Sequence, residues 1–111
     1  MMNPQDLFVK SDLVPVVIQD SASKEVLMVG YTNQEAFDKT RETQTAWFWS
    51  RSRKRLWQKG ETSKNFLFVQ DILVDCDKDT LLYLCRPAGP TCHTGQASCF
   101  YQRFEEDHDN G

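Results

Sequence analysis

The stretch VDCDKDT, residues 74–80, places side chains that suit two kinds of metal within seven residues. Asp75, Asp77 and Asp79 alternate along it, and their carboxylates are the oxygen ligands that magnesium and calcium prefer. Cys76 lies between the first two, and a thiolate prefers a softer metal such as zinc. In an extended chain the three aspartates would line one face and Cys76 the other. A solvated turn is the alternative without function, because acids also favour turns.

Three cysteines and a histidine form a second group of residues that could bind a metal. Cys76, Cys92 and Cys99 are separated by 16 and 7 residues, which is not the C-x-x-C spacing of a zinc ribbon. Spacing alone therefore leaves open both a metal site and small buried hydrophobic side chains. Cys92 stands next to His93 in PAGPTCHTG (87–95), a loop in which chemistry is more frequent than core packing. Three cysteines would leave a fourth zinc position open, as in catalytic sites, and His93 is then the candidate base.

Residues 47–65, WFWSRSRKRLWQKGETSKN, interleave tryptophan with basic side chains. One interpretation is a platform for single-stranded nucleic acid, in which bases stack on the rings. Another is a pocket for a phosphorylated nucleotide, because KGETSKN adds hydroxyls, ammonium groups and backbone N–H groups. A solvated basic loop is the alternative without function. The candidate phosphate ligands are Arg51, Ser52, Arg53, Lys54, Arg55, Lys59, Thr62 and Ser63, and the candidate aromatic contacts are Trp49 and Trp57.

Alternating and apolar segments predict the elements that position these side chains. Strands are expected over 13–20, 25–31, 45–50, 65–77, 80–86 and 97–104, with the first two forming a hairpin across the turn DSASK. The pattern predicts an α+β fold with a small, mostly antiparallel sheet and one or two helices. Cys85 lies in the apolar run LLYLC and is expected to pack in the core.

Two details of these elements can be predicted from local signals. Thr32 and Glu35 form a capping box, which predicts a helix over 32–43. Large apolar groups occur on both faces of 45–50, so we expect a helix or another subunit to cover the second face.

Length and charge bound the range of functions. The 111 residues are expected to form one domain over 1–104, followed by a solvated acidic tail over 105–111. The net charge is −3, but without the four acids of the tail the chain carries 13 basic and 12 acidic side chains. A local cationic stretch in a near-neutral body indicates a small anionic ligand rather than a duplex. No secretion signal or membrane-length apolar run is visible, so we expect a cytoplasmic chain without disulfides.

Three long motifs in fixed order, WFWSRSRKRLWQKGETS, VDCDKDTLLYL and GPTCHTGQASCF, resemble those of the phosphoribosyl-AMP cyclohydrolase family. The resemblance extends from GYTNQEAF (30–37) to Phe100. It implies an enzyme of histidine biosynthesis that hydrolyses the N1–C6 bond of the adenine ring of phosphoribosyl-AMP. The family often carries a fused pyrophosphohydrolase domain, and we expect this chain to be the single-activity form. Lys64 stands where a glycine commonly follows GETS in the family.

The resemblance also implies roles at the matching positions. Zn2+ is expected on Cys76, Cys92 and Cys99, Mg2+ on Asp75, Asp77 and Asp79, and catalysis is expected from His93. An intertwined homodimer with active sites built from both subunits is implied, without nucleic-acid or membrane partners. The main alternative is a zinc-stabilised single-stranded nucleic-acid binding module resting on 47–59. A third hypothesis is a magnesium or calcium binding protein without catalysis.

Overall fold

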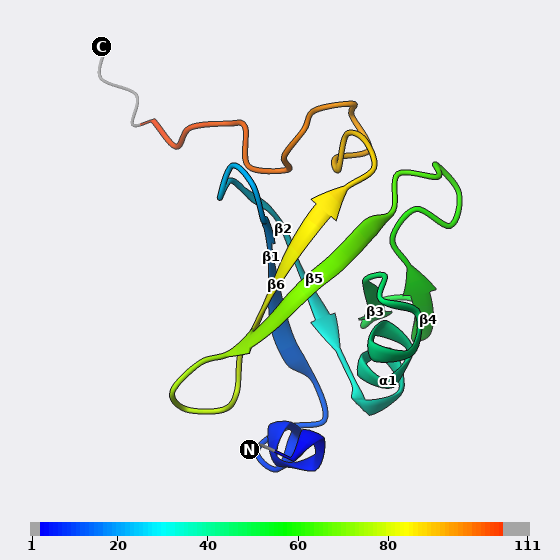
Figure 1. Ribbon diagram of the computed structural model, residues 1–111, viewed down its shortest axis with the longest axis vertical. Coiled ribbons are helices and arrows are strands. Elements are labelled where there is room, and N and C mark those ends of the chain that lie inside the picture. Colours follow the sequence, from blue (N-terminus) through cyan, green and yellow to red (C-terminus); the bar gives the residue numbers. More distant parts are fainter. Residues whose placement is uncertain (1–2, 106–111) are drawn as a thin grey trace.

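A twisted four-stranded sheet forms the centre of the molecule, described here for residues 3–105 of a computed structural model (Figure 1). Its strand order is β2-β1-β6-β5, and β3 and β4 form a separate two-stranded hairpin. β1 is antiparallel to β2 and parallel to β6, and β6 is antiparallel to β5. The elements are η1 (Pro4–Phe8, a 3-10 helix), β1 (Val14–Asp20), β2 (Val26–Thr32), α1 (Gln34–Thr43), β3 (Trp47–Ser50), β4 (Arg55–Gln58), β5 (Leu67–Val74) and β6 (Leu81–Pro87). The predicted α+β class with a mostly antiparallel sheet is confirmed.

The core lies against one face of the four-stranded sheet. Alternation along β1 and β6 turns every second side chain inward, and α1 and β3 supply the opposing layer with Phe37 and Phe48. Cys85 is fully buried in this core, as predicted, and burial raises the pKa of its thiol to about 12. In β3, Phe48 is buried while Trp47 and Trp49 on the other face remain partly exposed.

The start of α1 differs from the prediction. Asn33, not Thr32, is the N-cap, and its side-chain oxygen accepts a hydrogen bond of 2.9 Å from the backbone N–H of Ala36. Thr32 is instead the last residue of β2, where its side chain is buried. The predicted N-cap is therefore wrong by one residue, and Thr32 and Glu35 do not form the predicted capping box. Asparagine is an equally good cap, and the end of the strand decides between the two positions.

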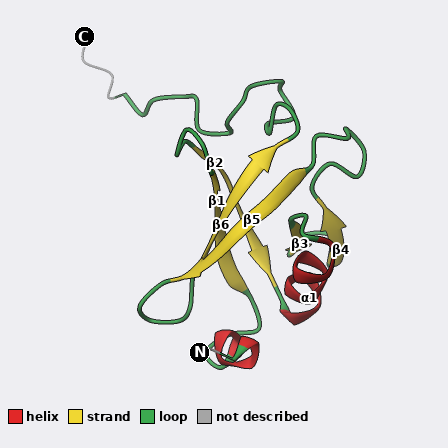
Figure 2. Ribbon diagram, viewed as in Figure 1, coloured by secondary structure: helices red, strands yellow, loops and turns green. Residues whose placement is uncertain are grey.

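The structure adds one strand that the sequence did not predict and corrects two predicted ones (Figure 2). The short strand β4 was not predicted, because only four residues separate two polar turns. Residues 75–79 form a turn rather than the end of a strand. The predicted strand 97–104 is absent: the Ser98 hydroxyl and the Cys99 N–H bond the carbonyls of Val26 and Leu27 at 2.6 and 2.8 Å, without a continuous ladder. The predicted acidic tail lies outside the described residues from position 106 onward.

The other face of the sheet carries an apolar row. Val29, Val17, Leu82 and Leu73 are neighbouring register partners across β2, β1, β6 and β5. Val29 is 46% exposed and Leu73 is 45% exposed, so solvent reaches both ends of the row. No helix within residues 3–105 combines the length and apolar composition needed to cross a membrane.

Candidate active site

A cavity of about 840 Å³ joins the basic stretch to the loop after β6. Arg53, Arg55 and Lys59 line it, and Cys92 and His93 reach it from the loop. Its other lining residues include the predicted ligands Ser52, Thr62, Ser63 and Trp57. The structure thus brings most of the predicted phosphate ligands beside the predicted catalytic histidine.

Other members of the predicted substrate-binding set lie outside the cavity. Arg51, Lys54 and Trp49 are not among its lining residues. The Arg51 guanidinium instead stacks over the ring of Tyr31, 4.1 Å from the ring centroid. The position of Arg51 fits a role in holding the β3–β4 turn against β2 better than contact with a ligand in this cavity.

The turn after β4 is held by Glu61, a residue that the sequence did not single out. The Glu61 carboxylate accepts 2.8 Å hydrogen bonds from the Arg55 guanidinium and from the backbone N–H of Gln58. The Arg55 contact is the largest factor lowering the pKa of Glu61, so the carboxylate is ionised at neutral pH. The only signal in the sequence was an acid within a basic stretch. Lys64, which ends this turn, has a left-handed φ of 69°, and this explains why glycine suits the position.

The loop 91–99 brings Cys92 and Cys99 together. The N–H of Gly95 donates to the carbonyl of Cys92 at 3.0 Å, and the Cys99 N–H holds the end of the loop on β2. The Cys99 thiol lies close enough to Cys92 to affect its pKa, and the Thr94 hydroxyl donates a hydrogen bond to the Cys92 sulfur at 3.0 Å. The Thr94 contacts, with help from Lys59, lower the pKa of Cys92, whereas burial raises the pKa of Cys99. Two adjacent sulfurs, one of them favouring the thiolate, suit a soft cation such as zinc.

Cys76 does not meet these two cysteines within one chain. It is exposed in the turn between β5 and β6, at the opposite end of the sheet from the loop 91–99 (Figure 1). The seven residues of β6 separate the two ends, which corresponds to about 20 Å at 3.3 Å per residue. Zinc holds each sulfur at about 2.3 Å. A single chain in this structure therefore assembles only two of the three predicted zinc ligands.

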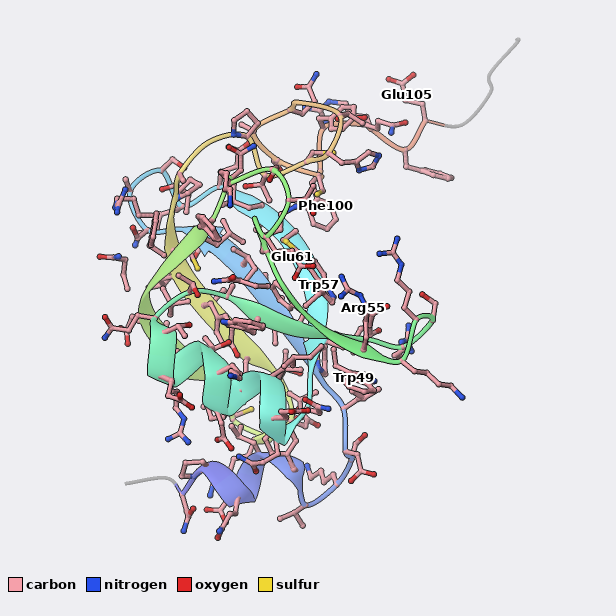
Figure 3. The ribbon with its side chains drawn as sticks, turned by 90° about the vertical axis from the view of Figure 1, so that its right-hand side faces the viewer. Trp49, Arg55, Trp57, Glu61, Phe100 and Glu105 are labelled. Carbon is pink, nitrogen blue, oxygen red and sulfur yellow. The ribbon has the colours of Figure 1, made fainter. Side chains whose placement is uncertain are left out.

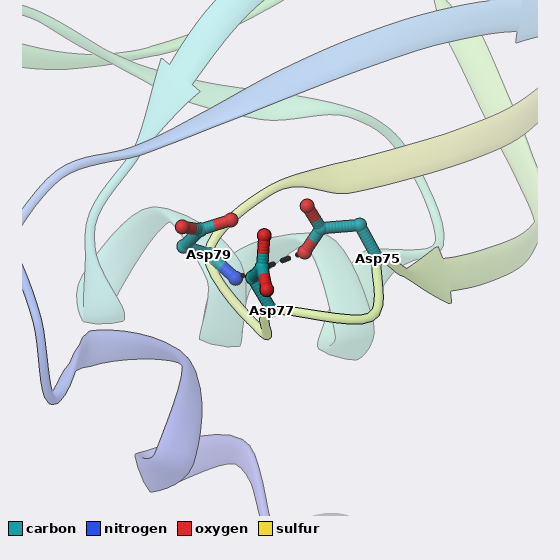
Figure 4. A group of neighbouring side chains, drawn as sticks. All are labelled: Asp75, Asp77 and Asp79. Atoms are coloured by element: carbon teal, nitrogen blue, oxygen red, sulfur yellow. Dashed lines mark hydrogen bonds between the residues drawn. The ribbon is translucent and has the colours of Figure 1, made fainter.

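The three aspartates do converge. Ligand oxygens of Asp75, Asp77 and Asp79 all lie within 4.8 Å of one another (Figure 4). Strand alternation is not the cause: a carboxylate oxygen of Asp75 accepts hydrogen bonds from the N–H groups of Asp79 and Thr80 at 3.0 and 3.2 Å, which closes a turn. These backbone donors, Asp79 first, lower the pKa of Asp75. Lys10 lies beside the cluster, 3.8 Å from Asp79.

Fold and site together define an α+β protein with a cationic cavity beside a pair of thiols. The family model for phosphoribosyl-AMP cyclohydrolase matches residues 28–101. A phosphoribosyl-AMP cyclohydrolase of Lacticaseibacillus paracasei is 57% identical over 97 residues, which cover 87% of this chain and 88% of that protein. One of Clostridium botulinum strain Kyoto is 58% identical over 82% of this chain and 83% of that protein. The histidine biosynthesis bifunctional protein HisIE of Bacillus subtilis is 52% identical over 90% of this chain and 48% of its own length.

The chain belongs to the phosphoribosyl-AMP cyclohydrolase family, a family of enzymes. The resemblance of the three motifs is thereby confirmed.

Proposed function

We propose that this chain opens the adenine ring of phosphoribosyl-AMP by hydrolysing its N1–C6 bond, in histidine biosynthesis and with dependence on Zn2+ and Mg2+. The observation that carries the proposal is the cavity shared by Arg53, Arg55 and Lys59 with Cys92 and His93. The names of the relatives support the same reaction. A cytoplasmic location fits a site that depends on reduced thiols.

The residues of the cavity fit the parts of this reaction. C6 is an amidine-like carbon, and substitution at N1 leaves the ring cationic or readily protonated, so C6 is electrophilic. The basic and hydroxyl side chains would hold the two phosphates of the substrate. His93 would accept the proton of the attacking water and return it to the leaving nitrogen. Zinc, when bound, would lower the pKa of a water molecule in the cavity.

The predicted zinc ligands fit the metal if two chains share the site. Cys92 and Cys99 offer adjacent sulfurs, and the third would be Cys76 of a second copy. The turn that carries Cys76 borders an apolar hollow of about 360 Å³, formed around Val17, Leu73 and Leu82 of the exposed row. An exposed apolar row of this kind marks an interaction surface. A second copy with two-fold symmetry would cover it and build two equivalent sites.

The aspartate cluster fits a hard divalent cation. Three carboxylates within 4.8 Å need only small rotations to share an ion such as magnesium. The cluster would bind Mg2+ and through it hold a phosphate or orient water. The same turn carries Cys76, so the two proposed metals would bind close to each other.

An absorbance assay with phosphoribosyl-AMP, Zn2+ and Mg2+ tests the reaction directly. We expect turnover by the purified chain and about one zinc per chain by metal analysis. The Cys92→Ser, Cys99→Ser double variant should lose the zinc, and His93→Ala should keep the zinc but lose kcat. Absence of turnover by the wild type rejects the function; full zinc content in the double variant rejects the ligand set.

A mixing experiment tests the shared site. Cys76→Ser and Cys92→Ser should each be inactive. In a mixed dimer one site receives both substitutions and the other receives none. Random mixing should therefore restore about a quarter of the wild-type activity, because about half of the dimers are mixed and each has one intact site. No recovery after subunits have exchanged would show that the site is not shared.

The alternatives have less support. A single-stranded nucleic-acid module needs an extended track of charges and rings, whereas Arg53, Arg55 and Lys59 line the same pocket as Cys92 and His93. A metal-binding protein without catalysis does not account for His93 and Cys92 lining a cationic cavity.

A further inference from the structure

One carboxylate lies where an anion is expected to bind. Among the cavity-lining residues of the described part of the chain, Glu61 is the only acid. The basic residues that line the cavity are Arg53, Arg55 and Lys59. A free carboxylate there would repel a phosphate. Glu61 is not free, because each of its oxygens accepts a 2.8 Å hydrogen bond, one from Arg55 and one from the backbone of Gln58.

We propose that Glu61 is a positioning residue that fixes Arg55 as the principal phosphate ligand of the cavity, an inference that rests on the proposed function. Figure 3 shows Arg55, Trp57 and Glu61 on the same side of the hairpin. Within residues 3–105, Arg55 is the only cavity cation held in an ion pair. Its contact to Glu61 uses one guanidinium nitrogen, so the other N–H donors remain for a phosphate.

The second contact of Glu61 extends this effect to the turn. The bond from the Gln58 N–H ties Glu61 to the end of β4, and the residues that follow are Thr62 and Ser63. The Glu61 carboxylate therefore fixes the position of the Arg55 guanidinium, at the start of β4, relative to the hydroxyls of Thr62 and Ser63 in the turn after β4. Ordering Arg55 before the substrate binds lowers the entropy cost of binding. The contact should therefore increase the affinity for substrate.

Glu61→Gln separates the two contacts. The amide oxygen of glutamine can still accept from the Gln58 N–H, while its NH2 group would face Arg55 and cannot pair with it. We expect KM for phosphoribosyl-AMP to rise about fivefold, the size expected for a half-exposed ion pair, with kcat within about twofold of wild type. Affinity for AMP, measured by calorimetry as a probe independent of turnover, should fall by the same factor.

Two further variants make the test specific. Arg55→Lys removes the planar guanidinium, and adding Glu61→Gln to it should raise KM no further, because both changes act through one contact. Asp38→Asn is the matched control: it breaks a 2.9 Å Asp38–Arg41 pair of similar exposure on α1, and KM should stay unchanged.

The proposal is overturned if Glu61→Gln lowers kcat with KM unchanged, which would place Glu61 on the reacting atoms. It is also overturned if the effect of Glu61→Gln on KM remains undiminished in the Arg55→Lys background, which would indicate a general structural role. A wild type that binds AMP but shows no turnover would reject the proposed function; loss of AMP affinity in Glu61→Gln would still support the pairing.

Discussion

Gly60 lies in the turn beside the cavity, in a backbone conformation that leaves no room for a side chain. Its φ is +98°, and a Cβ at this position would lie 2.7 Å from the backbone nitrogen of Phe66 and 2.8 Å from its Cα. Because these neighbours are backbone atoms, they cannot rotate away. We expect Gly60→Ala to cost about 1–2 kcal/mol for the left-handed backbone. Overpacking against Phe66 should add about 1–3 kcal/mol.

Gly95→Ala provides the control for the backbone contribution. Gly95 has a similar φ of +93°, but a Cβ at this position would meet no atom of residues 3–105 within 4 Å, so only the first cost applies. Urea unfolding of both variants at one protein concentration should give a lower midpoint for Gly60→Ala, with m unchanged. Equal losses of unfolding free energy in the two variants would refute the predicted clash with Phe66.

Three other substitutions test separate parts of the structure. Cys85→Ser should lower the free energy of unfolding by about 1–3 kcal/mol, because it buries a hydroxyl in the core, and zinc content should not change; denaturation and metal analysis check both. Asn33→Ala should cost about 1 kcal/mol through loss of the helix cap, measured by thermal unfolding. Lys64→Gly should raise the free energy of unfolding by up to about 1 kcal/mol, measured by urea unfolding. It relieves about 1–2 kcal/mol of strain from the left-handed backbone, and the greater entropy of the unfolded chain offsets about 0.4–1 kcal/mol of this gain.

The spacing of hydrophobic residues predicted the longer helices and strands, in which the pattern repeats several times. The hairpin of β1 and β2, the helix α1 and the strand β6 lie within one or two residues of their predicted ranges. The strand β4 escaped prediction because it pairs only with β3, and four residues between charged turns carry almost no period. The predicted strand 97–104 failed for the opposite reason: its composition suits a strand, but the bonds of Ser98 and Cys99 to β2 replace strand pairing.

The site was predictable by residue type but not by geometry. The sequence indicated that Asp75, Asp77 and Asp79 converge, yet they do so through a turn whose donors are backbone N–H groups, which side-chain alternation cannot reveal. The contacts of Glu61 with Arg55 and Gln58 could not be predicted because they depend on β4, a strand that the sequence did not predict.

The order of the motifs along the chain explains why the proposed zinc site needs two chains. The turn with Cys76 precedes β6, and the loop with Cys92 and Cys99 follows it, so one extended strand stands between the ligands. A strand of seven residues holds its ends about 20 Å apart, and the sheet on both sides of it prevents the chain from folding back. The same sheet presents its apolar row next to Cys76. A two-fold partner seated on that row would therefore complete the zinc site and bury exposed apolar surface in one step.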